Sequence, residues 1–406
     1  MTIWIDPPAW PAHDRLWSHL VSDASLDELH AFAAAQGVPR RGFERDHYDV
    51  PEQAFGRLVA AGARPVSSRE LVDRLASSGL RRRKVDSMAR RAVGRPLLRP
   101  PRLQAGDLVA VPATAGVVPP DRLRAGMARL ESWGLHVHVA DHVLGHATEL
   151  HHLAASDADR AADFTAAWMD PAVKAVWAAR GGYGTQRMLD LLDWRLLAEA
   201  RPKVLVGFSD VTALHQAVAA RLGLVTIHSH VVTSLGRADP ASADELRRVV
   251  LDPESVVDLF EDRSVETVVP GQADGVLVGG NLALLAAEIG TSSSRAAVGG
   301  IVVLEDVAEE PYRVDRLLTQ LIRSGWFAGV AAIVLGTFSE CGDPAEVDAV
   351  LVDRLAPLDV PLVRGFDFGH TASSATVPLG VPATLDATLD SRRCALTLRH
   401  PPLACD

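Results

Sequence analysis

Short apolar runs alternate with longer stretches of helical periodicity between residues 103 and 235, and this alternation restricts the fold more than any other feature. The apolar runs predict strands at residues 107–112, 135–139, 172–178, 204–207 and 224–227. The stretches between them predict helices at residues 120–133, 159–169 and 209–221. Strands that alternate with helices usually pair in parallel, because each helix returns the chain to the edge where the previous strand began. The pattern therefore predicts a mainly parallel sheet covered by helices.

A second α/β region is expected at residues 276–400. Helices are predicted at residues 281–289 and 314–324, strands at 300–304 and 331–335, and β-like ends at 375–380 and 394–398. Residues 236–275 are polar and weakly periodic, which predicts a connection between domains. The predicted fold class is thus α/β: a Rossmann-like or flavodoxin-like parallel-sheet domain at 103–235 and a smaller α/β domain with a β-rich end at 276–400.

Residues 1–80 are expected to form a separate small α+β domain. A strand is predicted at residues 3–5 and a helix at 67–75. Ser25 is followed three residues later by Glu28, a capping-box pattern that predicts the start of another helix. A chain of 406 residues is long enough for two or three domains in total.

Residues 81–102 are strongly basic and end in prolines, which predicts an exposed linker between domains. A nucleic-acid or membrane patch is the alternative interpretation. The segment lacks interleaved aromatic residues for base stacking, and the net charge of the chain is −10. Because nucleic-acid binding relies on neutralising phosphates with Lys and Arg, we expect a plain linker and neither nucleic acid nor membrane as a partner.

The composition gives no sign of secretion, membrane insertion or a thiolate metal site. The three cysteines, Cys341, Cys394 and Cys405, form no C-x-x-C pair. No apolar run approaches the roughly 20 residues that span a bilayer. The first residues lack the basic and apolar regions of a secretory signal. We expect a cytoplasmic protein with no metal and no cofactor.

Ser209 is the strongest candidate for a reactive side chain. It follows the predicted strand at 204–207 and precedes a predicted helix, so it should lie at the carboxyl edge of the parallel sheet, where such folds bind ligands. Unpaired N–H groups at the helix start could stabilise an oxyanion. The segment departs from the G-x-S-x-G nucleophile elbow, since Val211 replaces the second glycine. A simple helix cap is an equally good interpretation of this segment alone.

Three further motifs could complete a site. Residues 180–184, Arg-Gly-Gly-Tyr-Gly, follow a predicted strand and could form an oxyanion or substrate loop, or only a tight turn. Glu305 ends a predicted buried strand and could orient a histidine, bind a cation or cap a helix. His370 follows an apolar segment, 365–369, that we expect to be a strand; a lone histidine of this kind is more often structural than catalytic. Hydrolysis needs a nucleophile, a base and an orienting acid, and these commonly lie far apart in sequence.

Six motifs in one order resemble the landmarks of the LD-carboxypeptidase family. They lie at residues 180–184, 207–214, 279–282, 304–306, 311–316 and 367–370. The resemblance covers roughly residues 103–400. One departure is visible, because residues 112–114 are Pro-Ala-Thr where the family usually has Pro-Ser. This change concerns substrate contacts near the first loop.

The resemblance implies a two-domain serine peptidase with a Ser209–His370–Glu305 triad. Ser209 would be the nucleophile, His370 the general base and Glu305 the residue that orients it. The backbone N–H groups of Gly182 and Asp210 would form the oxyanion hole. Candidate substrate-binding residues are Arg180, Tyr183, Asn281 and Arg313. The implied reaction is hydrolysis of the amide bond between an L-centre diamino acid and a terminal D-alanine in murein tetrapeptides, by a homodimer that recycles cell-wall fragments.

Two alternatives remain open. The related microcin-immunity hydrolases cleave aminoacyl or peptidyl nucleotides, but they carry a longer insertion between the serine and the glutamate than the 96 positions that separate Ser209 from Glu305. The other alternative is a peptide sensor without turnover. The presence of all three residue types of a triad favours an active enzyme.

Residues 1–80 resemble a short bacterial domain of unknown function, and they are rich in histidine. His13, His19, His30 and His47 occur there with Asp6, Asp23 and Asp49. Such side chains could form a metal or acid–base site, but their spacing matches no named metal motif. We therefore expect scattered structural polar residues. His136 and His138 share one face of a predicted strand and are expected to be buried or simply exposed.

Overall fold

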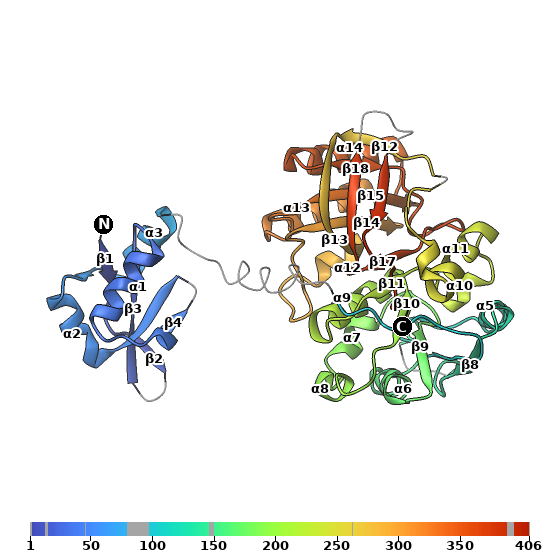
Figure 1. The fold of residues 1–406 in the computed structure, drawn as a ribbon, viewed down its shortest axis with the longest axis horizontal. Helices are drawn as coiled ribbons and strands as arrows, with labels where there is room; N and C mark the ends of the chain where they lie inside the picture. The colour runs from blue at the N-terminus through green and yellow to red at the C-terminus, as the bar shows by residue number, and fades with distance from the viewer. Residues whose placement is uncertain are drawn as a thin grey trace. The chain divides into compact units, whose positions relative to one another are not determined.

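The computed structural model describes residues 2–12, 15–44, 46–78, 97–145, 150–261, 263–387 and 394–405. The chain forms two compact units, Met1–Met88 and Ala89–Asp406 (Figure 1). Each unit has its own apolar cores and is described by itself. No helix among the described residues is long and apolar enough to cross a membrane.

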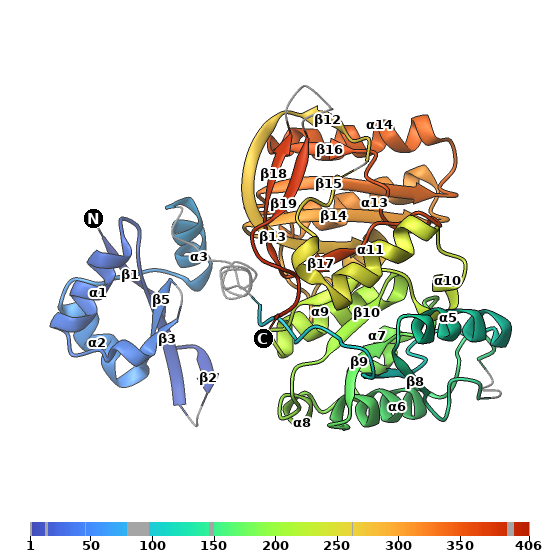
Figure 2. The same ribbon diagram turned by 45° about the vertical axis from the view of Figure 1, so that its right-hand side comes forward.

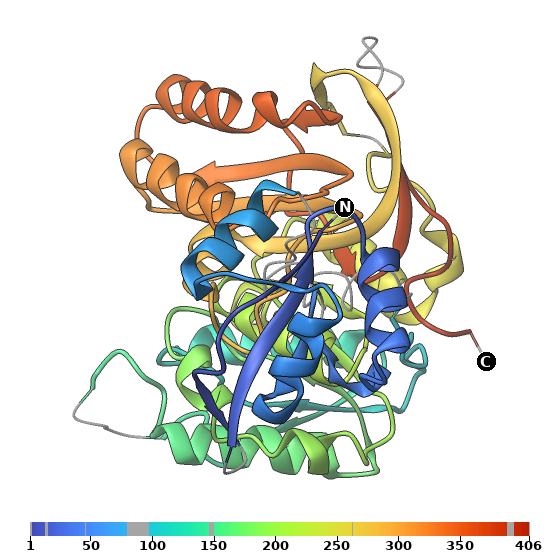
Figure 3. The same ribbon diagram turned by 90° about the vertical axis from the view of Figure 1, so that its left-hand side faces the viewer.

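The N-terminal unit is an α+β domain with helices on both faces of one sheet (Figure 3). Its elements are β1 (Ile3–Ile5), β2 (Trp10–Ala12), β3 (Arg15–Ser22), α1 (Leu26–Ala35), β4 (Phe43–Glu44), β5 (His47–Pro51), α2 (Glu52–Ala60), β6 (Arg64–Pro65) and α3 (Ser68–Ser77). The strand order is β4-β5-β3-β1-β6, with β2 paired to β3. Alternate residues of each strand point to opposite faces, so Leu20 packs in the core with α1 and α2, whereas Val21 packs with α3.

The predicted helix start at Ser25 is confirmed, but only half of the capping box forms. The Ser25 hydroxyl accepts the backbone N–H of Glu28. The Glu28 carboxylate accepts the hydroxyl of Ser22 instead of reaching back to the backbone of Ser25. The Ser22 hydroxyl in turn accepts the N–H of Ser25, so a serine supplies the second half of the cap.

The first sheet of the larger unit is the predicted doubly wound sheet (Figure 2). Its elements are β7 (Leu108–Val111), α5 (Pro120–Ser132), β8 (His136–Val139), α6 (Asp157–Met169), β9 (Val173–Trp177), α7 (Thr185–Leu189), α8 (Trp194–Leu197), β10 (Val204–Gly207), α9 (Thr212–Arg221), β11 (Thr226–His228) and α10 (Val232–Leu235). The order β8-β7-β9-β10-β11 is all parallel and reverses between β7 and β9. That order is flavodoxin-like, and such folds bind ligands beyond the carboxyl ends of the strands at this reversal.

The second sheet and the helices around it follow the first sheet along the chain. Its elements, with the helices around it, are α11 (Pro240–Leu251), β12 (Glu266–Val269), β13 (Gly271–Asn281), α12 (Leu282–Ala287), β14 (Gly300–Val307), α13 (Pro311–Arg323), β15 (Ala332–Ser339), α14 (Pro344–Leu355), β16 (Leu362–Arg364), β18 (Pro382–Ala387) and β19 (Ala395–Leu398). Strands β13 to β16 are parallel, and antiparallel β12, β18 and β19 lie beyond them. The late strand β17 (Val377–Leu379) instead joins the first sheet, antiparallel to β11. After β17 the chain passes from the first sheet to the second, where Gly380 donates its N–H to the carbonyl of Leu277 in β13.

Residues 236–275, predicted as a connection between domains, hold α11, β12 and the start of β13. One local expectation was wrong. Residues 365–369 are not a strand: β16 ends at Arg364, and Gly365 and Gly369 both have positive φ. Glycine tolerates that conformation, which lets the chain turn twice before His370.

The predicted linker is described only in its last part, since residues 81–96 lie outside the described ranges. Residues 97–102 belong to the larger unit. Leu98 forms a bridge with Leu224, and Pro101 forms one with Ala404. These residues therefore pair with other parts of the larger unit, while the predicted domain boundaries remain a prediction.

Candidate active site

Ser209 lies on a strained turn at the end of β10. Its φ of +64° is in the left-handed region, which is unusual for a residue with a side chain and common at functional sites. Two glycines make room for this turn. A methyl group on Gly181 would lie 2.8 Å from the Cβ of Ser209, and one on Gly207 would lie 2.8 Å from a methyl group of Val211. The missing second glycine of the elbow motif is thus compensated, because Val211 packs over Gly207.

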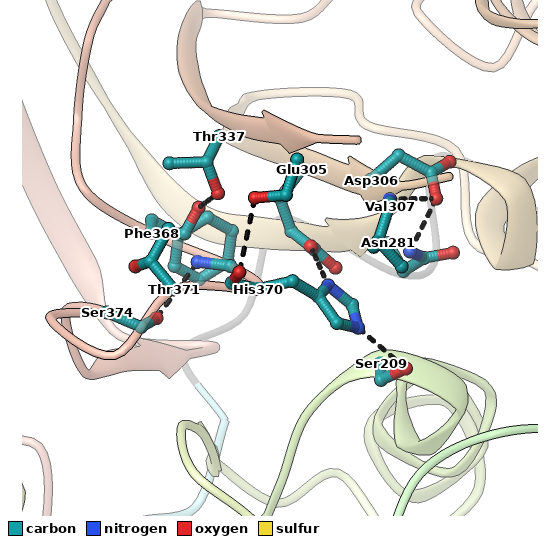
Figure 4. A network of polar contacts seen from close by, with 12 residues as sticks. Ser209, Asn281, Glu305, Asp306, Val307, Thr337, Phe368, His370, Thr371 and Ser374 are labelled. Atoms are coloured by element: carbon teal, nitrogen blue, oxygen red, sulfur yellow. Dashed lines mark hydrogen bonds and ion pairs between the residues drawn. The ribbon is translucent and has the colours of Figure 1, made fainter. Parts of the chain in front are cut away.

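His370 reaches Ser209 from a loop of the second sheet. Its Nε2 lies 3.0 Å from the Ser209 Oγ. The loop is held by polar contacts on either side of the histidine: Thr337 donates its N–H and hydroxyl to the carbonyl of Phe368, and Gly369 donates its N–H to the Ser374 hydroxyl. Figure 4 shows these contacts around His370. The imidazole is therefore positioned by the backbone on which it sits.

Glu305 completes the chain of hydrogen bonds. It lies near the end of β14, has no solvent exposure, and its Oε2 is 2.6 Å from the His370 Nδ1. An ionised carboxylate only accepts hydrogen bonds, so this contact places the imidazole proton on Nδ1. Nε2 is then free to accept the Ser209 hydroxyl proton. The geometry can perform the proton transfer that activates a serine for attack on a carbonyl carbon.

The loop after β9 borders the same position. Gly116 donates its N–H to the carbonyl of Gly181, which ties the loop after β7 to the loop after β9 at the strand-order reversal. Gly182 has a φ of +110° and is exposed. Asp210 lies in the first turn of a short 3₁₀ helix, Ser209–Val211, where backbone N–H groups have no partner within the helix. Of the predicted oxyanion donors, Asp210 thus lies in the turn that carries Ser209, and Gly182 follows Gly181 on the loop next to it.

Two family models match the larger unit. Residues 109–229 match the LD-carboxypeptidase N-terminal domain, and residues 274–385 match the LD-carboxypeptidase C-terminal domain. A putative carboxypeptidase of Streptomyces coelicolor is 51% identical over 311 residues, which cover 76% of this chain and 98% of that protein. A probable murein peptide carboxypeptidase of Bacillus subtilis is 36% identical over 297 residues, which cover 71% of this chain and 91% of its own.

The chain belongs to the LD-carboxypeptidase family. It is accordingly a serine-type carboxypeptidase, a hydrolase. The crystal structure of a muramoyltetrapeptide carboxypeptidase from Oxalobacter formigenes is 32% identical, has a TM-score of 0.63, and covers 73% of this chain and 99% of its own. The predicted fold class is confirmed by this likeness.

Two further comparisons concern the fold of the larger unit and the family of the N-terminal unit. The structure of MccF in complex with glutamyl sulfamoyl guanosine has a TM-score of 0.67 but only 21% identity, covering 76% of this chain and all of that one. At that identity the likeness shows the fold alone.

Residues 3–78 match a family described as "Protein of unknown function (DUF4031)". The N-terminal unit is therefore an addition to the LD-carboxypeptidase architecture.

Buried ionisable groups surround Ser209, His370 and Glu305. Burial raises the pKa of Asp306 to about 6, and nearby Glu305 adds to the rise although the Val307 N–H opposes it. Burial also raises the pKa of Asp210, against hydrogen bonds from Thr185. Burial lowers the pKa of His215 to about 4. The Nε2 of the neutral His215 ring lies 2.8 Å from the carbonyl oxygen of Gly207. This contact holds the end of β10.

The four predicted substrate-binding residues fall into two groups. Arg180 and Tyr183 are exposed on the loop that contacts Ser209, and Arg180 donates a hydrogen bond to the carbonyl of Val117. Arg313 is exposed at the start of α13, near Glu309.

Asn281 differs from those three because it is buried, with 3% exposure. Its amide nitrogen donates to Asp306, and its carbonyl oxygen accepts the N–H of Leu284. Both ends of the side chain thus hold the start of α12.

Several residues that shape the site were not predicted from the sequence. Asp306 directly follows Glu305 and accepts N–H groups from Ala283 and Val307 and the amide of Asn281. Ser374 and Thr337, which hold the His370 loop, carry no recognisable sequence pattern. The aromatic ring of Phe208 lies 4.7 Å from the imidazole of His370, and its place directly before Ser209 was the only available hint.

Proposed function

We propose that the enzyme hydrolyses the L,D-amide bond to the terminal D-alanine of murein tetrapeptides, with Ser209 as nucleophile, His370 as general base and Glu305 as the residue that orients it. The observation that carries this proposal is the continuous hydrogen-bonded chain from Glu305 through His370 to a strained serine. The murein peptide substrate is supported by relatives whose names carry it. Cytoplasmic recycling of imported wall fragments fits this substrate.

The proposed reaction has two steps. Ser209 Oγ attacks the amide carbonyl carbon while His370 Nε2 takes the hydroxyl proton, and the backbone N–H groups of Gly182 and Asp210 stabilise the oxyanion. His370 then returns the proton to the nitrogen of D-alanine, which leaves. A water molecule, deprotonated by His370, releases the acyl group from Ser209 and regenerates the enzyme.

Arg180 is the preferred partner for the free carboxylate of the substrate. It is exposed and directly precedes Gly181, whose backbone lies against Ser209. A planar guanidinium suits paired hydrogen bonds to a carboxylate. Tyr183 lies on the same loop at 50% exposure, with its ring 5.6 Å from that of His152. Arg313 lies on α13, away from this loop in the sequence, and is the weaker candidate, while Asn281 holds the start of α12.

Release of D-alanine tests the proposal. Purified enzyme is incubated with murein tetrapeptide, and the products are followed by mass spectrometry. We expect release by the wild type, a loss of at least about 10⁴-fold in Ser209→Ala, and no change in Ser255→Ala, an exposed serine that serves as the matched control. Binding of the peptide without any release would instead support a sensor.

A nucleotide-linked substrate is the second candidate, because the fold is also that of MccF. It predicts that aminoacyl sulfamoyl adenosine is cleaved faster than murein tetrapeptide. Comparing kcat/KM for the two compounds on the same preparation separates the candidates. The homodimer implied by the family resemblance is a separate prediction, tested by light scattering.

A further inference from the structure

One face of the N-terminal sheet gathers histidine and aspartate side chains that the sequence keeps apart. His47 and Asp49 are two positions apart on β5, so both point to one face. His19 on β3 is the cross-strand partner of Asp49. Strand register therefore brings His19, His47 and Asp49 together, on the face that packs against α3. The expectation of scattered polar residues is wrong for these three.

The atoms that face one another are metal-ligating atoms. The Nε2 of His47 lies 3.3 Å from the Asp49 Oδ1, and the Nε2 of His19 lies 3.8 Å from the same oxygen. One ligand atom from each residue falls within 4.8 Å of the others. Bonds of about 2.0–2.2 Å to a tetrahedral cation place neighbouring ligand atoms roughly 3.4 Å apart. The spacing thus fits a single cation between the three side chains.

A second layer of carboxylates orients both imidazoles. The His19 Nδ1 is 3.1 Å from the Oδ2 of Asp6, a side chain with 1% exposure that also accepts the Ser68 hydroxyl. The His47 Nδ1 is 2.7 Å from the Oδ1 of Asp46, which has 7% exposure. Metal-binding histidines characteristically donate their other N–H to a carboxylate, which fixes the ring and makes it a better ligand. Here both histidines do so, and both direct Nε2 to the same place.

The balance of charge also favours a cation. Three carboxylates, Asp6, Asp46 and Asp49, surround two imidazoles, and two of the three are buried. Concentrated negative charge away from water is costly unless a positive charge compensates it. A divalent cation bound between the two imidazoles would supply such a charge. The two rings are close, with centroids 5.1 Å apart, so both can reach one cation.

We propose that His19, His47 and Asp49 bind one divalent transition-metal cation of the Zn²⁺, Mn²⁺ or Fe²⁺ class. Two imidazoles and one carboxylate are a donor set that such cations accept. The three ligands are partly exposed, at 26%, 21% and 38%, while the aspartates behind the histidines are buried. Three protein ligands leave at least one coordination position open to water or another small ligand. His30 takes no part, since it contacts the Tyr48 hydroxyl, and His13 lies outside the described residues.

Metal titration of the full-length chain tests the proposal. Tag-free protein is stripped of metal with EDTA, dialysed, and titrated with ZnCl₂ in a calorimeter. The amount of bound metal is then measured by inductively coupled plasma mass spectrometry. We expect one equivalent per chain. His19→Ala and His47→Ala should each weaken binding by at least about 100-fold, and Asp46→Asn by about 10–100-fold. The exposed His136→Ala is the matched control and should bind as the wild type does.

A footprinting measurement uses only the wild type, so its result does not depend on how the variants fold. Diethylpyrocarbonate modifies accessible imidazoles, and the modified positions are found by peptide mass spectrometry. We expect Zn²⁺ to protect His19 and His47 and to leave His136 unchanged. The proposal is overturned if no stoichiometric metal binds, if both alanine variants bind as the wild type does, or if the two histidines gain no protection. Carboxypeptidase activity is not a readout, so this outcome is independent of the proposed function.

Discussion

The proposed triad and the N-terminal histidine cluster share one arrangement of carboxylate and imidazole. In both, a carboxylate contacts a histidine Nδ1 and so directs Nε2 outward: Glu305 does this for His370, and Asp6 does it for His19. The Nε2 of His370 points at the hydroxyl of Ser209. The Nε2 of His19 points at the carboxylate of Asp49, with a second imidazole alongside. What lies opposite Nε2 decides the chemistry, because a hydroxyl can give up a proton whereas a carboxylate and an imidazole together attract a cation.

The two regions also differ in how the chain assembles them. The N-terminal cluster depends on the twofold periodicity of two antiparallel neighbours, β3 and β5, and on their register. The triad depends on loops after strands of two different parallel sheets, with Ser209 and His370 separated by 161 positions. Four substitutions or treatments test this comparison.

The largest effect is expected from Glu305→Gln. The amide keeps the shape of the side chain but loses its charge, and its nitrogen can donate to Nδ1, which favours the wrong tautomer of His370. We expect kcat to fall by about 10³–10⁴-fold with little change in KM. The exposed Glu199→Gln is the matched control. Steady-state kinetics of D-alanine release checks this, and near-normal kcat in Glu305→Gln would remove the orienting role.

Gly181→Ala should have the next largest effect. The added methyl group would lie 2.8 Å from the Cβ and 3.0 Å from the Oγ of Ser209, so the nucleophile must move. A displacement of about 1 Å in a reacting group costs about 10²-fold in rate. Gly56→Ala, where an added methyl group meets nothing within 4 Å, should leave kcat unchanged. Equal rates in both variants would show that the loop after β9 does not constrain Ser209.

Asp306→Asn should change how stability depends on pH. The folded-state pKa of Asp306 is raised to about 6 from the ordinary 3.8, so the folded state keeps a proton that the unfolded state loses. This contribution is fully present below pH about 4 and is lost as the pH rises through about 6, on the order of 3 kcal/mol. The Asp306→Asn variant is neutral at every pH and therefore lacks that loss. Urea unfolding at pH 4, 5, 6 and 7 gives the two curves, and parallel curves would contradict the prediction.

Chelation should have the smallest effect on activity. The proposed cation lies in the N-terminal unit, and the mechanism proposed for Ser209, His370 and Glu305 uses no metal. EDTA treatment should therefore change kcat by less than about 2-fold while lowering the unfolding temperature of the N-terminal unit, because the metal stabilises only the folded state. Differential scanning calorimetry and D-alanine release on the same sample measure both effects. A large loss of activity that added Zn²⁺ restores would show that the two regions are not independent.

Much of the fold followed from periodicity, and the gaps have physical causes. The strands β7, β8, β9, β10 and β14 and the helices α5, α6 and α13 lie close to their predicted positions, since each has a strong local pattern. Residues 236–275 were missed because α11 is amphipathic within a polar stretch. The irregular segment before His370 is apolar, which predicts a strand, but apolar character alone does not distinguish a strand from a buried loop.

The α/β class, the order of the elements and the residues proposed for the triad followed from the sequence alone, because these depend on short-range patterns and on motifs in a fixed order. The folded chain was needed to show that Val211 packs over Gly207, that Asn281 holds the start of α12, and that His19, His47 and Asp49 share one face. The physical reason is distance along the chain. Local propensity sets which residues form a strand, whereas register, loop closure and burial set which side chains meet, and these depend on contacts between segments far apart in the sequence.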